Sequence, residues 1–220
     1  MSIKRQLVKD NNIKKEYSKV KKAKNLFDRP LVVFDTETGG LDIRPDYSFE
    51  TGKLTSGISP ILQIGAVKLD ETDLSEISSF HAVCGPERGQ TVKEFMAKCH
   101  PKALEVNGIT EERIASEGRP TSIVLKQFTN WVFSHPGKRF YFAGQNVKFD
   151  LAILESHFKL FNKKWYWAET GHLPEELRTY SRLYFALPNT PDVENHRLST
   201  VAEALGVNAE GAHDALCDVR

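Results

Sequence analysis

The sequence predicts an α/β fold in which helices pack against a mixed β-sheet, and three features lead to this prediction. Runs rich in β-branched and aromatic residues come first, between Leu31 and Val83. Segments with helical spacing follow from Pro101 onward. One short aromatic run, RFYFAG at residues 139–144, is inserted among them. Strands followed by helices with a further strand between them are typical of a mixed sheet covered by helices.

The composition suits one globular domain that carries a basic N-terminal extension. The chain has 220 residues, of which 40% are hydrophobic and 27% are charged, as in ordinary soluble proteins. Residues 1–30 hold ten Lys or Arg against three acidic residues, although the whole chain has a net charge of only +1. We therefore expect a basic extension at residues 1–28 and a domain at 29–220. Such an arm suits a nucleic-acid partner, while a solvated tail remains the alternative.

The sequence gives no sign of a membrane or secretory context. It contains no apolar run of membrane length, and the charged N-terminus lacks the apolar core of a signal peptide. Its three cysteines, Cys84, Cys99 and Cys217, form no metal-binding spacing and leave one thiol over if two pair. We therefore expect a cytoplasmic protein without disulfides, structural zinc or a membrane partner.

Three strand-like runs open the domain in order. They are LVVFDT at 31–36, PILQIGAVKLD at 60–70 and ISSFHAV at 77–83, and they predict a meander of neighbouring strands. The polar segment 43–59 between the first two is too long for a tight hairpin turn. It is predicted to be a surface loop.

The second half of the domain is predicted to be mostly helical. PKALEVNG ends at Gly108, Thr110 is a candidate N-cap for the next helix, and Phe128, Trp131 and Val132 give the segment 121–133 an apolar face. After the strand at 139–144, an amphipathic helix is expected at 147–161. Three further helical segments are expected within 175–187, 196–207 and 210–220.

Two carboxylates close the first strand. Side chains two positions apart in a strand share one face, so Asp35 and Glu37 are expected to lie together. Each charge raises the pKa of the other unless a proton or a cation relieves the repulsion. The pair alone is weak, because such spacings also arise on solvated strands, but it is a candidate metal site.

Two later segments add groups of the same chemistry. Asn146 and Asp150 flank the start of the helix at 147–161, where Asn146 could also serve only as an N-cap. His213 and Asp218 lie five residues apart, which corresponds to about 140° of rotation on one helix. We therefore expect His213 in the loop before the last helix and Asp218 on that helix. A histidine there can take a proton from a water acidified by a metal site.

Four short motifs together resemble a known family. FDTETGGLD, QIGAV, NVKFD and HDALCD occur in this order between residues 34 and 218. They are similar to the DEDDh (DnaQ-like) 3′-to-5′ exonucleases, which include the proofreading epsilon subunit of bacterial DNA polymerase III and ribonuclease T. The resemblance implies a ribonuclease H-like fold and an exonuclease domain at residues 29–220.

The resemblance also implies roles for particular residues. Asp35, Glu37, Asp150 and Asp218 would bind two divalent cations, Mg²⁺ or Mn²⁺, which suit an all-carboxylate shell. His213 would be the general base. Contacts to the terminal nucleotide are implied for the residues that follow the first strand and for one at the second motif, namely Thr36, Thr38, Gly39, Leu41 and Asn146.

The implied activity is hydrolysis of phosphodiester bonds at 3′ ends of single-stranded or frayed DNA, with release of nucleoside monophosphates. The implied partners are such 3′ ends and a replication or repair polymerase. An exoribonuclease and a non-catalytic nucleic-acid-binding homologue remain the alternatives, and Gly39, where a threonine is frequent in the family, leaves DNA or RNA open. The aromatic run Trp165–Trp167 is expected to pack in the protein, with base stacking as the lesser alternative.

Overall fold

The computed structural model describes residues 27–43, 46–48, 53–55, 57–134, 139–163, 174–207 and 214–219. Three sequence predictions fall outside these residues: the basic arm up to residue 26, the aromatic run 165–167, and the placement of His213. None of the helices in the described segments has the length and apolarity that crossing a bilayer requires.

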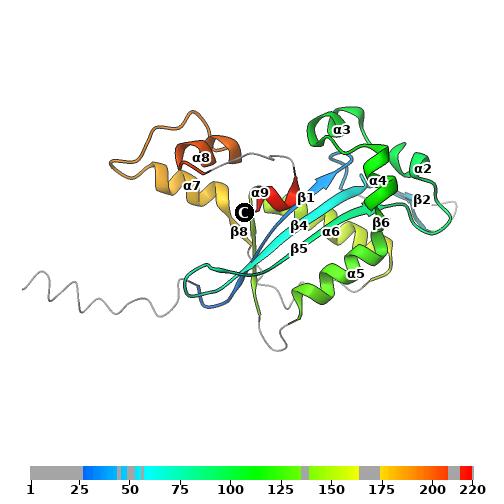
Figure 1. Cartoon of the computed structure of the whole chain (residues 1–220), viewed down its shortest axis with the longest axis horizontal. Coiled ribbons are helices and arrows are strands. Elements are labelled where there is room, and N and C mark those ends of the chain that lie inside the picture. The colour runs from blue at the N-terminus through cyan, green and yellow to red at the C-terminus, as the bar shows by residue number, and fades with distance from the viewer. Residues whose placement is uncertain are drawn as a thin grey trace, which may run out of the picture.

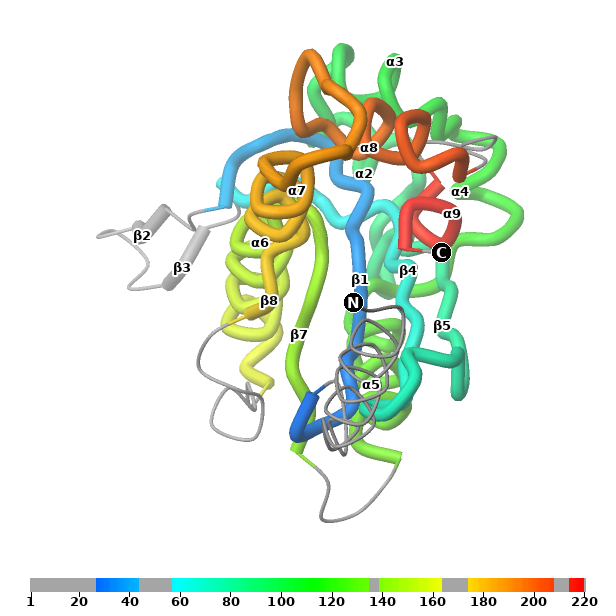
Figure 2. Tube along the Cα trace, turned by 90° about the vertical axis from the view of Figure 1, so that its left-hand side faces the viewer, coloured from blue at the N-terminus to red at the C-terminus, as the bar shows by residue number. Residues whose placement is uncertain are grey.

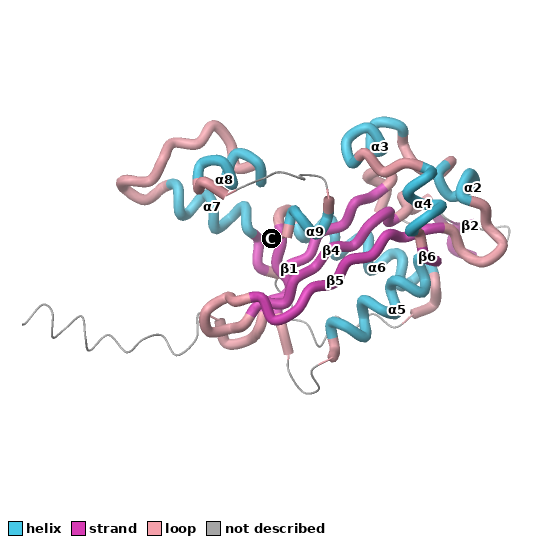
Figure 3. The backbone as a smooth tube through the Cα atoms, viewed as in Figure 1, coloured by secondary structure: helices cyan, strands magenta, loops and turns pink. Residues whose placement is uncertain are grey.

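Six of the described strands form a mixed sheet in the order β6-β5-β4-β1-β7-β8 (Figures 1 and 3). The three predicted long strands are neighbours and antiparallel, whereas β7 lies parallel to β1 on its other side. This arrangement confirms the predicted meander and the predicted mixed sheet. The strands are β1 (Leu31–Thr38), β4 (Ile61–Leu69), β5 (Glu76–Gly85), β6 (Arg119–Pro120), β7 (Tyr141–Gly144) and β8 (Glu175–Glu176).

Helices cover both faces of this sheet. The two longest, α5 and α6, lie on one face, while the short α9 lies on the other face beside β1 and β4 (Figures 1 and 2). The described helices are α2 (Val92–Met96), α3 (Pro101–Asn107), α4 (Glu111–Glu117), α5 (Thr121–Val132), α6 (Val147–Leu160), α7 (Leu177–Phe185), α8 (Leu198–Ala204) and α9 (Ala215–Asp218).

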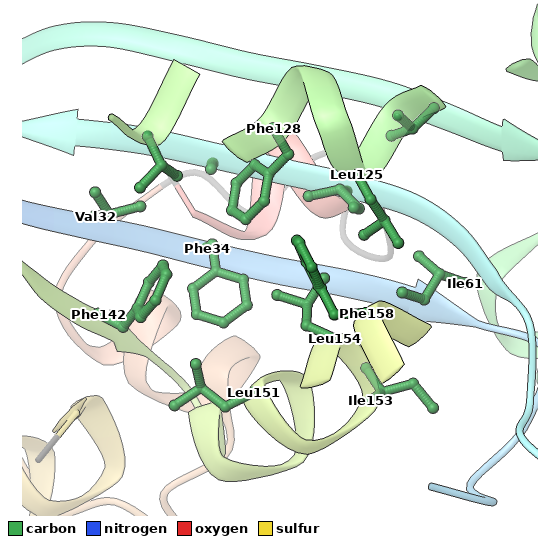
Figure 4. Close-up of a cluster of buried hydrophobic side chains, with 14 of the residues drawn as sticks. Val32, Phe34, Ile61, Leu125, Phe128, Phe142, Leu151, Ile153, Leu154 and Phe158 are labelled. Carbon is green, nitrogen blue, oxygen red and sulfur yellow. The ribbon is translucent and has the colours of Figure 1, made fainter. Parts of the chain in front are cut away.

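The main core lies between the sheet and helices α5 and α6 (Figure 4). Val32 and Phe34 of β1 point into it, and Phe34 lies 4.9 Å from the Phe142 ring and 6.3 Å from the Phe128 ring. Burying each of these large side chains contributes about 1.5–3 kcal/mol. Because residues alternate along a strand, this packing directs Asp35 and Glu37 to the opposite face.

A smaller apolar cluster supports the second face near the end of β1. It joins the sheet to helices α2 and α4 through Leu62, Val83, Phe95, Met96, Ile109 and Ile114. Thr110 is the N-cap of α4, as predicted, and Gly108 ends α3 at φ 63°. Helices α2 and α4 are therefore fixed to the sheet by an apolar core of their own.

The structure corrects two local predictions. The segment 43–59 is not a plain loop, because β2 (Asp46–Ser48) and β3 (Lys53–Thr55) pair within it as a small antiparallel sheet. Three-residue strands are too short to show a periodic signal. The helix expected from residue 175 begins instead at Leu177, because Glu175 and Glu176 pair with the end of β7 as β8.

Candidate active site

The end of β1 presents Asp35 and Glu37 on the face of the sheet opposite the main core. In the ladder with β4, Asp35 lies opposite Gly65 and Glu37 lies opposite Gln63. The sequence prediction that the two carboxylates share a face is confirmed. Their place is set by the burial of the alternate residues on the other side of the strand.

Asp150 reaches the same region from the first turn of α6. Its Oδ1 accepts a hydrogen bond from the Thr36 amide at 3.0 Å and from the Thr36 hydroxyl at 2.6 Å. The parallel pairing of β1 with β7 ends at Val33 and Ala143, so the Thr36 N–H makes its bond to a side chain of α6 instead. Thr36 therefore ties α6 to the strand that carries the first two carboxylates.

Asp218 is brought to the site by α9, which lies directly on the sheet. Gly65 makes this contact possible, because a Cβ there would lie 2.2 Å from the backbone carbonyl of Ala215. Gly65 is also the strand partner of Asp35. The helix is therefore held next to the carboxylates of β1.

Carboxylate oxygens of Asp35, Glu37 and Asp218 all lie within 4.8 Å of one another. Burial, followed by the charges of the neighbouring carboxylates, raises the pKa of Asp35 to about 8. Burial also raises the pKa of Glu37 to about 7, with the charge of Asp218 as the next cause. A cluster that resists losing its protons near neutral pH is strongly stabilised by a cation, which fits a metal site.

The pKa of Asp150 follows the same pattern. Burial raises it to about 7, although the two hydrogen bonds from Thr36 act in the opposite direction. Asp150 also adds to the rise in the pKa of Asp35, so the two carboxylates are electrostatic neighbours. Four acidic groups from β1, α6 and α9 thus converge, as the sequence motifs predict.

A pocket of about 740 Å³ opens beside these carboxylates. It is bounded on one side by the end of β1 and the turn that follows, residues 36–42, and on the other by the segment 98–107. Leu41 lies at this pocket with 82% of its surface exposed. The pocket is larger than a water or ion requires and is within the size range of small-molecule sites.

The Gly39–Gly40 turn is fixed by contacts on both sides. The Thr38 hydroxyl donates to the Gly40 carbonyl at 2.7 Å, and the His100 amide donates to the Gly39 carbonyl at 2.6 Å. A Cβ at Gly39 would lie 2.6 Å from the Cys99 sulfur, so a larger residue would push the two walls of the pocket apart. Buried Asn107 adds a bond from its amide to the Thr38 carbonyl at 3.2 Å.

The predicted substrate residues are only partly gathered at the pocket. Thr36, Thr38, Gly39 and Leu41 line it, whereas Asn146 does not. Asn146 is the N-cap residue of α6, as the alternative interpretation predicts, and it has φ 57°, but its side chain makes no capping hydrogen bond. The backbone N–H of Asn146 donates a hydrogen bond to the Glu176 carboxylate at 2.8 Å.

Sequence reasoning missed several residues that hold the site. Gln63, Asn107 and Asp214 make hydrogen bonds between segments that are far apart in the chain. Gln63 and Gly65 belong to the QIGAV motif, so the motif could have drawn attention to them. The sequence alone does not indicate what either residue does.

Comparisons with known proteins agree with this geometry. The model of the RNase_T family, described as exonuclease, matches residues 32–220. Two curated relatives are both DNA polymerase III PolC-type, from Bacillus cereus and Oceanobacillus iheyensis. Each is 23% identical over 193 or 195 residues, which cover 88% or 89% of this chain. The chain spans only 11% of the length of these relatives.

Solved structures share the fold at low identity. E. coli exonuclease I in complex with a dT13 oligonucleotide has a TM-score of 0.64 and 19% identity, covering 87% of this chain and 39% of the other. Cell-death related nuclease 4 has a TM-score of 0.62 and 18% identity, covering 88% of this chain and 60% of the other.

These structures confirm the fold, and the family match confirms the predicted resemblance to DnaQ-like exonucleases. Because the match covers most of the chain, residues 32–220, including every motif that supplies a carboxylate, this chain belongs to the RNase T family of DnaQ-like exonucleases.

Proposed function

We propose that the chain is a metal-dependent enzyme that removes nucleoside monophosphates from the 3′ ends of single-stranded or frayed DNA. The observation that carries the proposal is the convergence of four carboxylates beside a pocket of about 740 Å³. A protein that only binds nucleic acid has no use for mutually repelling carboxylates next to a phosphate path. The non-catalytic alternative is therefore disfavoured.

The donor set fits a pair of divalent cations of the Mg²⁺ or Mn²⁺ type. Asp35, Glu37, Asp150 and Asp218 would hold them, because these hard cations prefer carboxylate oxygens. When bound, such a pair supplies Lewis-acid stabilisation to the attacking and departing oxygens of an in-line displacement at phosphorus. Binding would also release the protons that the raised pKa values keep on the metal-free cluster.

The residues of the chain divide the remaining work. The pocket between Leu41 and the segment 98–107 would hold the terminal nucleotide. Gly39 and Gly40 have no side chain, so the protein backbone there can lie close to this nucleotide. His213 would take the proton of the attacking water. The water oxygen would bond to phosphorus while the bond between phosphorus and the 3′ oxygen of the preceding nucleotide breaks. That 3′ oxygen takes a proton from solvent and becomes a hydroxyl, and the terminal nucleotide leaves as a 5′ monophosphate.

The preference for DNA rests on a relative and on the family resemblance. E. coli exonuclease I is a structural neighbour solved with a DNA oligonucleotide. We further propose that a replication or repair polymerase is a partner, since the curated relatives are DNA polymerases. Co-purification of the tagged chain with its host polymerase would test this partner, and recovery of the chain without any polymerase would contradict it.

We propose a cytoplasmic location, because three free cysteines, one of them buried, suit a reducing compartment.

We also propose that residues 29–220 form the exonuclease domain and that the basic segment 1–28 adds contacts to phosphate. Halving the net charge of the arm with Lys21→Gln, Lys22→Gln and Lys24→Gln should weaken DNA binding and flatten its dependence on salt. An unchanged salt slope would remove the arm from the proposal.

The decisive experiment offers 3′-labelled and 5′-labelled single-stranded DNA and RNA to the protein with Mg²⁺. The 3′ label should be released at once as a mononucleotide. The strand that carries the 5′ label should become shorter by one nucleotide at a time. Faster loss of RNA would establish the exoribonuclease alternative. Release from 5′ ends, or no release with Mg²⁺ or Mn²⁺, would overturn the proposed function.

A further inference from the structure

The last helix of the structure has little apolar contact to hold it in place. It comprises only four residues, Ala215–Asp218, and Ala215 is its only buried side chain. Yet α9 carries Asp218 and begins two residues after His213 in the chain, and the proposed function depends on both groups. Such a short helix cannot be stable on its own, so tertiary contacts must hold it.

Gln63 makes two of these contacts from the sheet below and a third bond within the sheet. Its side chain is completely buried, and its Nε2 donates to Asp214 Oδ2 at 2.8 Å and to His81 Nε2 at 2.5 Å. Its Oε1 accepts a hydrogen bond from the Ala215 amide at 3.1 Å. Both hydrogens and the oxygen of the amide are thus engaged, and this defines the orientation of the side chain.

Asp214 connects these contacts to the helix. Its Oδ1 accepts from the Leu216 and Cys217 amides as the N-cap, while its Oδ2 accepts from Gln63 and from Arg113 Nη2 at 3.3 Å. Burial alone would raise the pKa of Asp214, but the bonds from Gln63 and Arg113 lower it below its usual value. The carboxylate therefore stays charged as an acceptor.

We propose that Gln63 and Arg113 are positioning residues that act through Asp214 to fix helix α9, and with it Asp218, in the site. The inference rests on the proposed function for its catalytic consequence, and on the geometry alone for the anchoring of α9. Asp214 adjoins His213 in the chain and precedes Asp218 by one helical turn. Gln63 is also the strand partner of Glu37. The same residue therefore lies beside a carboxylate of β1 and makes hydrogen bonds to the start of α9.

A donor–acceptor exchange between Gln63 and Asp214 tests the proposal. Gln63→Glu sets two carboxylates against each other, and Asp214→Asn sets two amide groups against each other. In the double variant the new amide at position 214 donates to the new carboxylate at position 63, which still accepts from the Ala215 amide. Each single variant should lower kcat by about 10–100-fold with KM changed less than about twofold, because a charge-assisted hydrogen bond is lost.

The double variant should recover at least about tenfold over the weaker single variant, which independent sites would not do. Hydrogen exchange of the amides of residues 215–218 gives a readout independent of catalysis. It should accelerate in each single variant and slow again in the double variant. Mn²⁺ affinity of the same proteins should follow the exchange rates, because Asp218 moves with α9.

Controls separate this result from general destabilisation. Glu117→Ala removes the carboxylate that accepts from Arg113 Nε at 3.4 Å without touching Asp214, and it should change neither exchange nor kcat. If Gln63→Glu does not fold, Asp214→Ser serves instead, because it keeps a capping oxygen but cannot reach Gln63. Fast exchange of α9 with low kcat is then expected, and exchange as slow as in the wild type would overturn the proposal.

The two proposals can fail separately. A wild-type protein that releases no nucleotide would end the proposed function, while the exchange data would still decide whether Gln63 anchors α9. An active wild type whose double variant exchanges as fast as the single variants would end the positioning role and leave the exonuclease assignment standing.

Discussion

The carboxylates of β1 and the carboxylate of α9 reach one site by different means. Asp35 and Glu37 lie on a strand whose alternate residues are buried in the main core, with neighbours on both sides in the sheet. Asp218 lies on a four-residue helix that has a single buried side chain. Hydrogen bonds from polar groups, and not apolar packing, fix this helix to the sheet.

This difference separates the groups that apolar packing holds from those that hydrogen bonds hold. A strand in a packed sheet keeps its side chains in place because moving them would disrupt the core. The α9 helix depends on the orientation of a few polar atoms and on the missing side chain of Gly65. We therefore expect the β1 half of the site to withstand conservative changes nearby, and the α9 half to respond sharply to them.

Removing a β1 ligand should have the largest effect. Asp35→Asn should lower nuclease activity by about 10³-fold or more, because metal stabilisation of the transition state is worth several kcal/mol. The protein should remain folded, since Asp35 contributes repulsion to the metal-free site. Nucleotide release and thermal unfolding measure the two effects, with Asp73→Asn in the exposed β4–β5 turn as the control. Full activity of Asp35→Asn would contradict the ligand assignment.

Displacing α9 without touching the core should have the next largest effect. In Gly65→Ala the new Cβ meets the backbone of Ala215, so the helix must move while the sheet can stay intact. We expect activity to fall by about 10²-fold, because a displacement of about 1 Å of a catalytic group such as Asp218 has an effect of this size. Gly85→Ala, where the nearest atom would lie at 3.2 Å in Gly118, is a matched control. Equal activity of the two variants would show that α9 is not part of the site.

The same contrast explains what could be predicted from the sequence. The strands at β1, β4 and β5 and helix α6 are long enough to show the periodicity of their apolar residues, and these carry Asp35, Glu37 and Asp150. The motif spacing also places Asp218 on a final helix, as the structure has it. Order along the chain thus indicates the four acidic groups and the mixed sheet.

The remainder depends on contacts that no local pattern reveals. Gln63 bonds to Ala215 across 152 positions, and the role of Gly65 depends on a helix that only tertiary structure places. The hairpin of β2 and β3 has strands of three residues, too short for an alternating signal. The family resemblance implies a substrate contact for Thr36, yet its hydroxyl and amide bind Asp150.

Stability of the metal-free protein should fall as the pH rises. The pKa values of Asp35, Glu37 and Asp150 are raised from about 4 to about 7–8 on folding, so between these values the folded state binds more protons than the unfolded chain. Their destabilising effect is absent below pH 4 and complete above pH 8. With EDTA present, we expect a loss of several kcal/mol between pH 5 and pH 8 in denaturant titrations, because each shifted group costs about 1.4 kcal/mol per pH unit in this range.

Divalent cations and Asp35→Asn should both reduce this pH dependence. A cation neutralises the cluster at pH 8, and the substitution removes the most strongly shifted group. Wild-type and Asp35→Asn proteins with the same dependence on pH in EDTA would contradict the repulsion that the pKa values imply.

Loss of the bond between Thr36 and Asp150 should have the smallest effect. Thr36→Val removes the hydroxyl donor at 2.6 Å but leaves the amide donor at 3.0 Å. One net hydrogen bond to a charged group corresponds to about tenfold in activity. Thr129→Val removes a similar hydroxyl within α5 and should leave turnover unchanged. Equal turnover of both variants would show that Asp150 is held without this hydroxyl.

The central claim is that cations relieve the repulsion within this carboxylate cluster, and calorimetry tests it most directly. Mn²⁺ is titrated into the metal-free protein at pH 7 in two buffers with different ionisation enthalpies, which counts the protons released. Because the pKa of Asp35 is raised to about 8, binding should release about one proton or more, and Asp35→Asn should release fewer. Saturable binding with no proton release, or the same release from Asp35→Asn, would contradict the account.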